Sequence, residues 1–317
     1  MNENDSNKAD ELIKIKISHL IKFAQNFQGV EVHVLVSGKF VKMNYGNEQF
    51  LDILKKLQEK KLEEVYINQV DCKRIMSEIQ QIVNSKSSPD QTKMQSSENS
   101  LEIMKAFITQ MGITKEAIDI LNTINKNTLG ILQQSPNLLD WIKRFKTVCS
   151  EEFLKSILAS YLSCRIIDQF PWGSGPIKEK TCLASMLCDI NLSKDDFASL
   201  KDYELNGGPL SDKIKNHPLE IMRILSARKD IVSSETLVII EQHHERPDGS
   251  GFPYGIQGPR FNQLSSIFIV SQQFINHLVN CNFDYQQRKV IIEKIYEVYR
   301  GKNFDKAVGA LVSVVNN

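Results

Sequence analysis

The chain has 317 residues, 41% of them hydrophobic, so it is long enough to form two domains with buried cores. Its 39 basic and 38 acidic residues give a net charge of +1, a balance that argues against nucleic acid or an anionic membrane surface as a partner. The six cysteines show no Cys-x-x-Cys spacing, which is typical of free thiols in a reducing compartment. Residues 1–11 are polar, unlike a signal peptide, and no apolar run approaches the ~20 residues that span a bilayer. We therefore expect a cytoplasmic protein with no segment inserted in a membrane.

The first 83 residues predict a small α/β domain. Valine occupies every second position from residue 30 to residue 36, with Glu31 and His33 between, which is the alternation of a β-strand buried on one side. This part of the sequence shows no cluster of catalytic residue types, so we interpret it as a sensory or docking domain. The expected elements are strands over residues 30–36, 39–45 and 64–68, a helix that Asn47 caps and that runs to about residue 61, and a helix over residues 72–82.

A polar segment, residues 84–100, separates this domain from the rest of the chain. It lacks apolar periodicity, and Met94 is its one large apolar residue, so a linker is expected. From residue 101 to residue 317, apolar residues recur at spacings of three and four, which predicts helices. The predicted fold class is thus α+β, with a small N-terminal α/β domain followed by an all-α helical bundle. The expected helices cover residues 101–111, 115–133, 138–148, 151–169, 178–190, 217–227, 234–242, 264–279 and 286–300.

The most distinctive segment is residues 241–255, with the sequence EQHHERPDGSGFPYG. Its adjacent histidines offer imidazole nitrogen to transition metals, its carboxylates can add oxygen ligands, and its glycines allow a tight loop. The segment resembles the HHExxDGxGYP signature of HD-GYP domains, metal-dependent phosphodiesterases that hydrolyse cyclic di-GMP. The matching residues are His243, His244, Glu245, Asp248, Gly249, Gly251 and Pro253, and Phe252 replaces the tyrosine.

The resemblance covers about residues 150–317, with its best match from 181 to 274, and implies an HD-superfamily helical bundle in a bacterial signalling protein. In the family, one metal takes the aspartate of an HD dipeptide, a histidine followed by proline, and the double histidine. The counterparts here are Asp189, His217, His243 and His244. Three imidazoles and one carboxylate form a complete ligand set for one divalent transition metal, Fe, Mn or Zn.

The ligands of the family's second metal are largely replaced. Cys188 stands at the histidine of the HD dipeptide, Leu192 at a following lysine, and Gln272 at a late aspartate. An upstream histidine is also missing, and Phe153 or Ser156 marks its position. Cys188 could still act as a soft metal ligand through a thiolate, and the alternative is a buried apolar cysteine.

The acids around the double histidine have several possible roles. Glu241 and Glu245 flank the histidines, and either could orient a ligand from behind, but solvated acids at helix ends are commoner. Asp248 is expected to shape the loop or orient a histidine rather than bind metal directly.

These replacements predict a degenerate HD-GYP-like signalling protein with at most one metal site and a regulatory or protein-interaction role in cyclic di-GMP signalling. No residue is assigned a catalytic role. Two alternatives stay open, an active metal-dependent cyclic di-GMP phosphodiesterase and a nucleotide or metal sensor without turnover. The expected partners are cyclic di-GMP itself and proteins of its signalling system. The loop residues expected to contact a protein partner are Asp248, Gly249, Gly251, Phe252 and Pro253.

Overall fold

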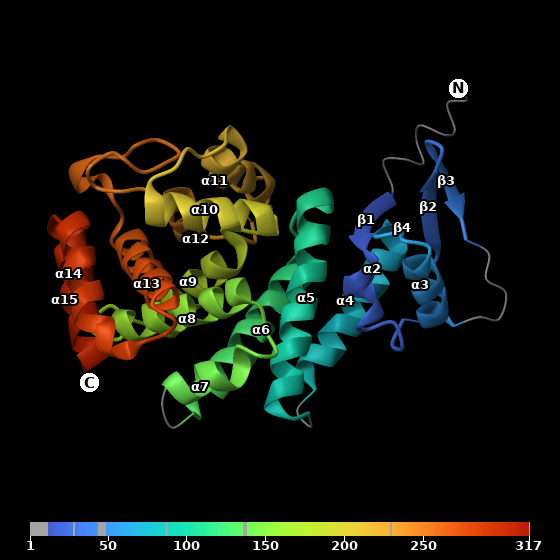
Figure 1. Cartoon of the computed structure of the whole chain (residues 1–317), viewed down its shortest axis with the longest axis horizontal. Coiled ribbons are helices and arrows are strands. Elements are labelled where there is room, and N and C mark those ends of the chain that lie inside the picture. Colours follow the sequence, from blue (N-terminus) through green and yellow to red (C-terminus); the bar gives the residue numbers. More distant parts are fainter. Residues whose placement is uncertain are drawn as a thin grey trace. The chain divides into compact units, whose positions relative to one another are not determined.

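The structure is a computed structural model that describes residues 12–27, 29–43, 49–85, 88–135, 138–228 and 230–316. Residues 1–11 and the expected helix cap Asn47 lie outside these ranges. A small sheet near the N-terminus is followed by helices, which confirms the predicted α+β class (Figure 1). The chain divides into two compact units, Met1–Thr123 and Ile124–Asn317. In the described part of the chain, no helix is long and apolar enough to cross a membrane.

The first unit is built on an antiparallel sheet with the strand order β1-β4-β2-β3. In β2, Val32 and Val34 are buried as the valine pattern predicts, whereas Val36 at the end of the strand is 52% exposed. Alternate residues of β4 are also buried, and the register places Val32 opposite Ile67. Strand β1 is an addition to the predicted set, and it also pairs with β4, where Ile13 lies opposite Ile67. The strands are β1 (Leu12–Lys16), β2 (Val32–Val36), β3 (Lys39–Lys42) and β4 (Glu64–Asn68).

A helix occupies most of the segment for which the sequence predicts a linker. Helix α5 contacts β1 and the preceding helices α2 and α4, and its residue Met94 is fully buried. The apolar pattern predicts the second half of this helix, residues 101–111, and misses residues 90–100, because the inner face there also buries polar Ser97 and Asn99. Asn99 accepts a hydrogen bond from Lys22 Nζ at 2.5 Å. From residue 90 on, a helix of the first unit therefore replaces the expected linker. The helices of this unit are α2 (Ile17–Ile21), α3 (Phe50–Glu59), α4 (Gln69–Asn84) and α5 (Asp90–Met111), and α6 (Lys115–Gln133) crosses the boundary at residue 123.

The regular structure of the second unit is helical. Its helices are α7 (Leu138–Phe145), α8 (Glu151–Ile167), α9 (Gly175–Leu187), α10 (Lys194–Asn206), α11 (Asp212–Ser226), α12 (Ser234–Gln242), α13 (Gln263–Asn280), α14 (Arg288–Val298) and α15 (Lys302–Asn316). Helix α13 forms its core: it buries Phe268 and Phe274 and packs against α8, α12, α14 and α15. Helices α10 and α15 are additions to the predicted set, and α10 begins with a capping box formed by Ser193 and Asp196.

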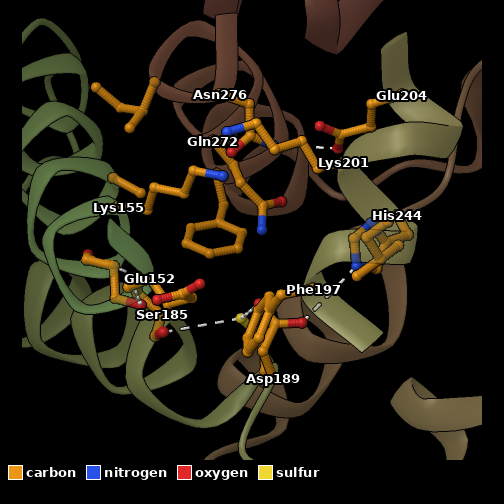
Figure 2. A pocket seen from close by; sticks show the side chains of 16 residues that line it. Glu152, Lys155, Ser185, Asp189, Phe197, Lys201, Glu204, His244, Gln272 and Asn276 are labelled. Atoms are coloured by element: carbon orange, nitrogen blue, oxygen red, sulfur yellow. Dashed lines mark hydrogen bonds and ion pairs between the residues drawn. The ribbon is translucent and has the colours of Figure 1, made fainter. Parts of the chain in front are cut away.

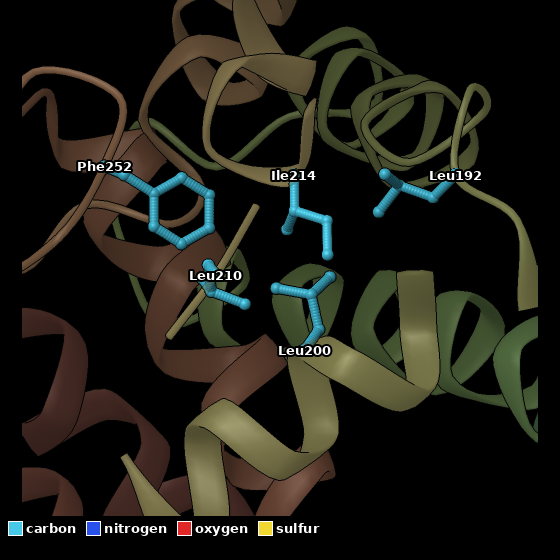
Figure 3. Close-up of a cluster of buried hydrophobic side chains, with 5 residues drawn as sticks. All are labelled: Leu192, Leu200, Leu210, Ile214 and Phe252. Carbon is cyan, nitrogen blue, oxygen red and sulfur yellow. The ribbon is translucent and has the colours of Figure 1, made fainter. Parts of the chain in front are cut away.

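A small hydrophobic cluster joins α10, the start of α11 and the glycine-rich loop (Figure 3). Phe252, at the position of the family's tyrosine, and Leu192, at the position of its lysine, both contribute apolar surface here. The cluster therefore fixes the loop near the first turn of the helix that carries His217. Its buried members are Leu192, Leu200, Leu210, Ile214 and Phe252.

We predict that Leu200→Ala lowers the free energy of unfolding by about 2–4 kcal/mol, because it leaves a cavity in this cluster. The matched control on the same helix is Leu205→Ala, since Leu205 is 55% exposed and should change stability by less than about 0.5 kcal/mol. Urea unfolding of both variants measures the difference. Equal losses in the two variants would show that the cluster does not stabilise this unit.

Candidate metal centre

Three segments that are far apart in the sequence meet at one point. Asp189 follows the end of α9, His217 lies inside α11, and His243 and His244 directly follow the last residue of α12. Helix α12 packs against both α9 and α11, so the three segments are held side by side. One nitrogen or oxygen atom from each of the four side chains lies within 4.8 Å of the others. The structure thus brings the predicted ligand quartet together.

The carboxylate of Asp189 lies at the centre of the quartet. Its Oδ1 atom is 3.2 Å from His217 Nε2, 3.4 Å from His243 Nε2 and 3.8 Å from His244 Nε2. The Nε2 atoms of His217 and His243 are 3.2 Å apart. His217 and His243 are fully buried, and the side chain of His244 is 8% exposed. Three imidazole edges therefore face one carboxylate oxygen in a nearly dry site.

The orientation of His217 depends on the proline that follows it. In a regular helix the carbonyl of Ile214 would accept a hydrogen bond from the backbone nitrogen of residue 218. Pro218 has no N–H, so this carbonyl is free to bind another donor. His217 Nδ1 lies 2.6 Å from it. The proline therefore provides the acceptor that holds the imidazole ring.

The orientation of His243 depends on the end of α12. The last four carbonyls of a helix have no partner inside the helix. Ile240 is one of these residues, and His243 Nδ1 lies 2.6 Å from its carbonyl oxygen. In both histidines Nδ1 thus donates to a backbone carbonyl, and Nε2 is the nitrogen directed at Asp189, where a metal would bind.

Burial and hydrogen bonding also set the charges of the site. Burial disfavours the Asp189 carboxylate, but hydrogen bonding to His217 and His243 outweighs it, so the pKa of Asp189 is lowered well below its usual value. Burial, with a further contribution from His243, lowers the pKa of His244 to about 3. Asp189 is therefore ionised and His244 neutral at pH 7, the states in which each binds a metal.

The quartet fits a divalent metal ion. Two ligands of one metal lie at most about 4.2 Å apart, because each bond is ~2.1 Å long. The three distances from Asp189 Oδ1, 3.2–3.8 Å, and the 3.2 Å between the Nε2 atoms of His217 and His243 lie within this limit. The four ligand atoms all lie within 4.8 Å of one another, so binding one ion asks at most for small shifts of the side chains. His244 Nε2 is buried and has no hydrogen-bond partner among the described residues, which is costly unless it binds a ligand. Within the described ranges, this is the one group of three or more His, Cys, Asp or Glu side chains close enough to share a metal.

The positions of the replaced ligands border a cavity of about 60 Å³ beside the quartet (Figure 2). Ser156, Cys188 and Gln272 all line it, together with Asp189 and His244. Phe153, the other candidate for the upstream position, is buried in the core and does not line the cavity. Helices α8, α9 and α13 therefore still present these positions to one space, but with donors that bind metals weakly.

Cys188 does not belong to the quartet. Its thiol is 2% exposed and lies 3.4 Å from Asp189 Oδ2 and 3.7 Å from the carbonyl of Ser185. The Cys188 thiol donates to Oδ2 of Asp189, whereas His217 and His243 lie nearest to Oδ1 of the same carboxylate. The structure thus gives Cys188 a place beside the aspartate, oriented toward it by a weak S–H hydrogen bond.

Glu245 differs from the sequence expectation of a solvated acid. It is fully buried, and its two carboxylate oxygens accept hydrogen bonds from the backbone nitrogens of Tyr254 at 2.6 Å and Ile256 at 2.8 Å. Glu241 lies nearer the surface, where its carboxylate accepts a hydrogen bond from the Tyr254 hydroxyl at 3.1 Å. Sequence reasoning missed the role of Glu245 because the partners are backbone groups nine and eleven residues away.

The glycine-rich loop is compact and contacts the ligand quartet through His244. Asp248 Oδ1 accepts hydrogen bonds from Ser250 N at 2.9 Å and Ser250 Oγ at 2.7 Å, the loop-shaping role expected for it. A side chain at Gly251 would overlap the backbone at residues 245 and 246, so glycine is required there. Phe252 stacks on the His244 ring with 4.6 Å between ring centroids. The loop therefore covers one side of the double histidine.

We predict that Glu245→Gln destabilises the protein by about 1–3 kcal/mol, because the amide cannot accept from both backbone donors and leaves one N–H unpaired. The matched change Glu241→Gln leaves an amide oxygen that can still accept from the Tyr254 hydroxyl in an exposed contact, so it should cost less than about 1 kcal/mol. Thermal unfolding and limited proteolysis of residues 249–256 measure both effects. Similar results for the two variants would contradict the anchoring role of Glu245.

Comparisons with known proteins agree with this architecture. No family model matches the sequence, and no curated protein matches it. Among solved structures, the chain is similar to Bd1817, an HDG"Y"P protein from Bdellovibrio bacteriovorus, with a TM-score of 0.53 and 14% sequence identity. The match covers 97% of this chain and 100% of that chain. The protein therefore has an HD-GYP-like fold, with a His and Asp cluster that could hold a metal ion.

Proposed function

We propose that the protein is a cytoplasmic, regulatory HD-GYP-like protein that holds one divalent transition metal and does not hydrolyse cyclic di-GMP. Its metal would be bound by Asp189, His217, His243 and His244. Three neutral imidazoles and one carboxylate suit Zn, Fe or Mn. In this role the metal ties α9, α11 and α12 together and fixes the loop that follows the double histidine.

The lining of the cavity beside the quartet is the observation that argues against catalysis. Two metals accelerate phosphodiester cleavage by activating water and stabilising the leaving oxygen. The space beside the quartet is lined by Ser156, Cys188 and Gln272 at the positions where the family has ligands for its second metal. A hydroxyl, a thiol and a neutral amide at these three positions supply no negative charge to hold a second divalent ion. Glu152 and Glu204 also line the cavity, but among the described residues neither joins a group of three or more side chains close enough to share a metal. The lining of this cavity therefore favours one bound metal ion over two.

The proposed output is protein binding through the loop. Tyr254 is 57% exposed, whereas its neighbour Phe252 is buried against His244. A rigid loop that presents an aromatic side chain and is anchored at a metal site suits recognition of a protein partner. The proposed partners are proteins of cyclic di-GMP signalling.

An active cyclic di-GMP phosphodiesterase is the second candidate, and a specific observation favours it. Lys155 and Lys201 line the cavity beside Asp189, together with Glu152 and Glu204 (Figure 2). Ammonium groups near one metal could hold a phosphate group, and the acids could move protons. The same lysines would serve a sensor that binds the nucleotide without turnover. Turnover and binding measurements separate these two candidates from the non-hydrolytic regulator.

We predict close to one metal ion per chain and no hydrolysis of cyclic di-GMP by the metal-loaded protein. Elemental analysis and a turnover assay on the same sample measure these two quantities. His243→Ala should lose the metal, because it removes a ligand from the centre of the quartet. The matched change His277→Ala should keep it, since His277 lies outside the quartet.

The outcomes distinguish the candidates. Two metals per chain with hydrolysis would contradict the proposal and support the phosphodiesterase. Binding of cyclic di-GMP with one metal and no hydrolysis would favour the sensor. Retention of the metal in His243→Ala would show that the ligand set is wrongly assigned.

We further predict that Cys188 is not a ligand, because its sulfur keeps its proton and faces Asp189 Oδ2. The cobalt-loaded protein should therefore show no thiolate-to-cobalt charge-transfer absorption in the near ultraviolet. Cys188→Ser should bind the same amount of metal as the unchanged protein. A charge-transfer band that disappears in Cys188→Ser would contradict this assignment.

A further inference from the structure

Two cysteines of the second unit lie side by side on adjacent helices, apart from the metal quartet. Cys164 on α8 and Cys182 on α9 have their sulfur atoms 3.4 Å apart. An S–S bond is about 2.05 Å long, so each sulfur would need to move only about 0.7 Å to form one. Cys182 is 5% exposed and Cys164 is half-buried, so a small molecule can approach the pair from the side of Cys164.

The two helices form an antiparallel hairpin that holds the thiols in register. Ser185 Oγ donates a hydrogen bond to the carbonyl of Ser156 at 2.9 Å on one side of the pair. Lys178 Nζ and the Asp168 carboxylate form an ion pair at 2.5 Å on the other side. Contacts on both sides therefore fix the separation of the helices at the level of the cysteines. The approach of the two sulfurs follows from the packing of the hairpin.

We propose that Cys164 and Cys182 form a dithiol site that hydroperoxides oxidise to a disulfide. None of the roles proposed above for the metal or the loop uses this pair. Its consequence for the fold is a covalent link between α8 and α9. Asp189 follows the end of α9 directly, so the link would fix the helix that positions the central metal ligand.

The arrangement assigns different roles to the two sulfurs. The hydrogen bond from Cys164 is the main cause that lowers the pKa of Cys182, whereas the same bond and burial raise the pKa of Cys164. Cys182 is therefore the sulfur that loses its proton more easily, and we assign it the role of nucleophile beside Cys164 at 3.4 Å. Lys178 is close enough to both thiols to affect their ionisation, and its positive charge favours the Cys182 thiolate.

The reaction is balanced with one hydroperoxide. The Cys182 thiolate attacks the terminal oxygen of hydrogen peroxide, the O–O bond breaks, and the released hydroxide takes a proton to form water. The product on Cys182 is a sulfenic acid. The sulfur of Cys164 then attacks the Cys182 sulfur, the S–S bond forms, the S–O bond breaks, and hydroxide leaves with the proton of Cys164 as a second water. Two thiols are oxidised by two electrons, and the peroxide is reduced to two waters.

The test uses the full-length, reduced, metal-loaded protein treated with a small molar excess of hydrogen peroxide. Remaining thiols are then alkylated under denaturing conditions, and peptides are mapped by mass. We expect two of the six thiols to become unreactive and a bridged peptide to link Cys164 with Cys182. The disulfide closes a loop of 18 residues, so it should raise Tm by roughly 5–10 °C, and dithiothreitol should reverse the rise.

Three variants make the assignment specific. Cys281→Ser, which removes another half-buried cysteine, should leave the bridge intact. Cys164→Ser should abolish the bridge and leave a sulfenic acid on Cys182 that dimedone traps. Cys182→Ser should abolish both the bridge and the dimedone adduct, and if it fails to fold, Cys164→Ser and the unchanged protein still decide the question. Six alkylatable thiols after treatment, sulfinic acids without a bridge, or a bridge that includes Cys281 would each overturn the proposal.

Discussion

Three imidazole nitrogens around one carboxylate oxygen are the interaction on which the second unit depends. His217 and His243 are fully buried, and their Nε2 atoms face each other at 3.2 Å beside Asp189. Imidazole nitrogens gathered around one ionised carboxylate form a group that a shared cation would stabilise. The backbone carbonyls that hold the Nδ1 atoms show that the orientation is built into the helices. A proline in α11 and the end of α12 supply those carbonyls.

The helices around the site and the glycine-rich loop hold this arrangement in place. Helix α12 packs between α9 and α11 and brings their ligands together, while α13 provides the buried core behind them. The glycine-rich loop covers the double histidine because Glu245 binds its backbone and Phe252 stacks on His244. The motif therefore has a structural role in this fold. It orders a loop around the cluster of Asp189, His217, His243 and His244 and leaves Tyr254 at the surface.

The sequence predicted the α+β class, strands β2, β3 and β4 of the sheet and the four residues that meet at the site. It could do so because the valine alternation and the signature motif are local patterns. The missed features depend on partners far away in the chain or on polar residues inside helices. The first half of helix α5 buries Ser97 and Asn99, so residues 90–100 lack the apolar spacing that predicts residues 101–111 as a helix. The burial of Glu245 follows from loop nitrogens at residues 254 and 256, which no helical period relates to it.

The replaced positions at Ser156, Cys188 and Gln272 border one cavity, so their loss affects a single place in the fold. The proposed non-hydrolytic, one-metal role rests on this concentration of the replacements in one place. The most direct measurement is a crystal structure of the metal-loaded protein with anomalous diffraction at the metal edge, which locates and counts the ions. The account predicts one anomalous peak per chain, within bonding distance of Asp189, His217, His243 and His244. A second peak in the cavity beside Cys188 and Gln272 would contradict it.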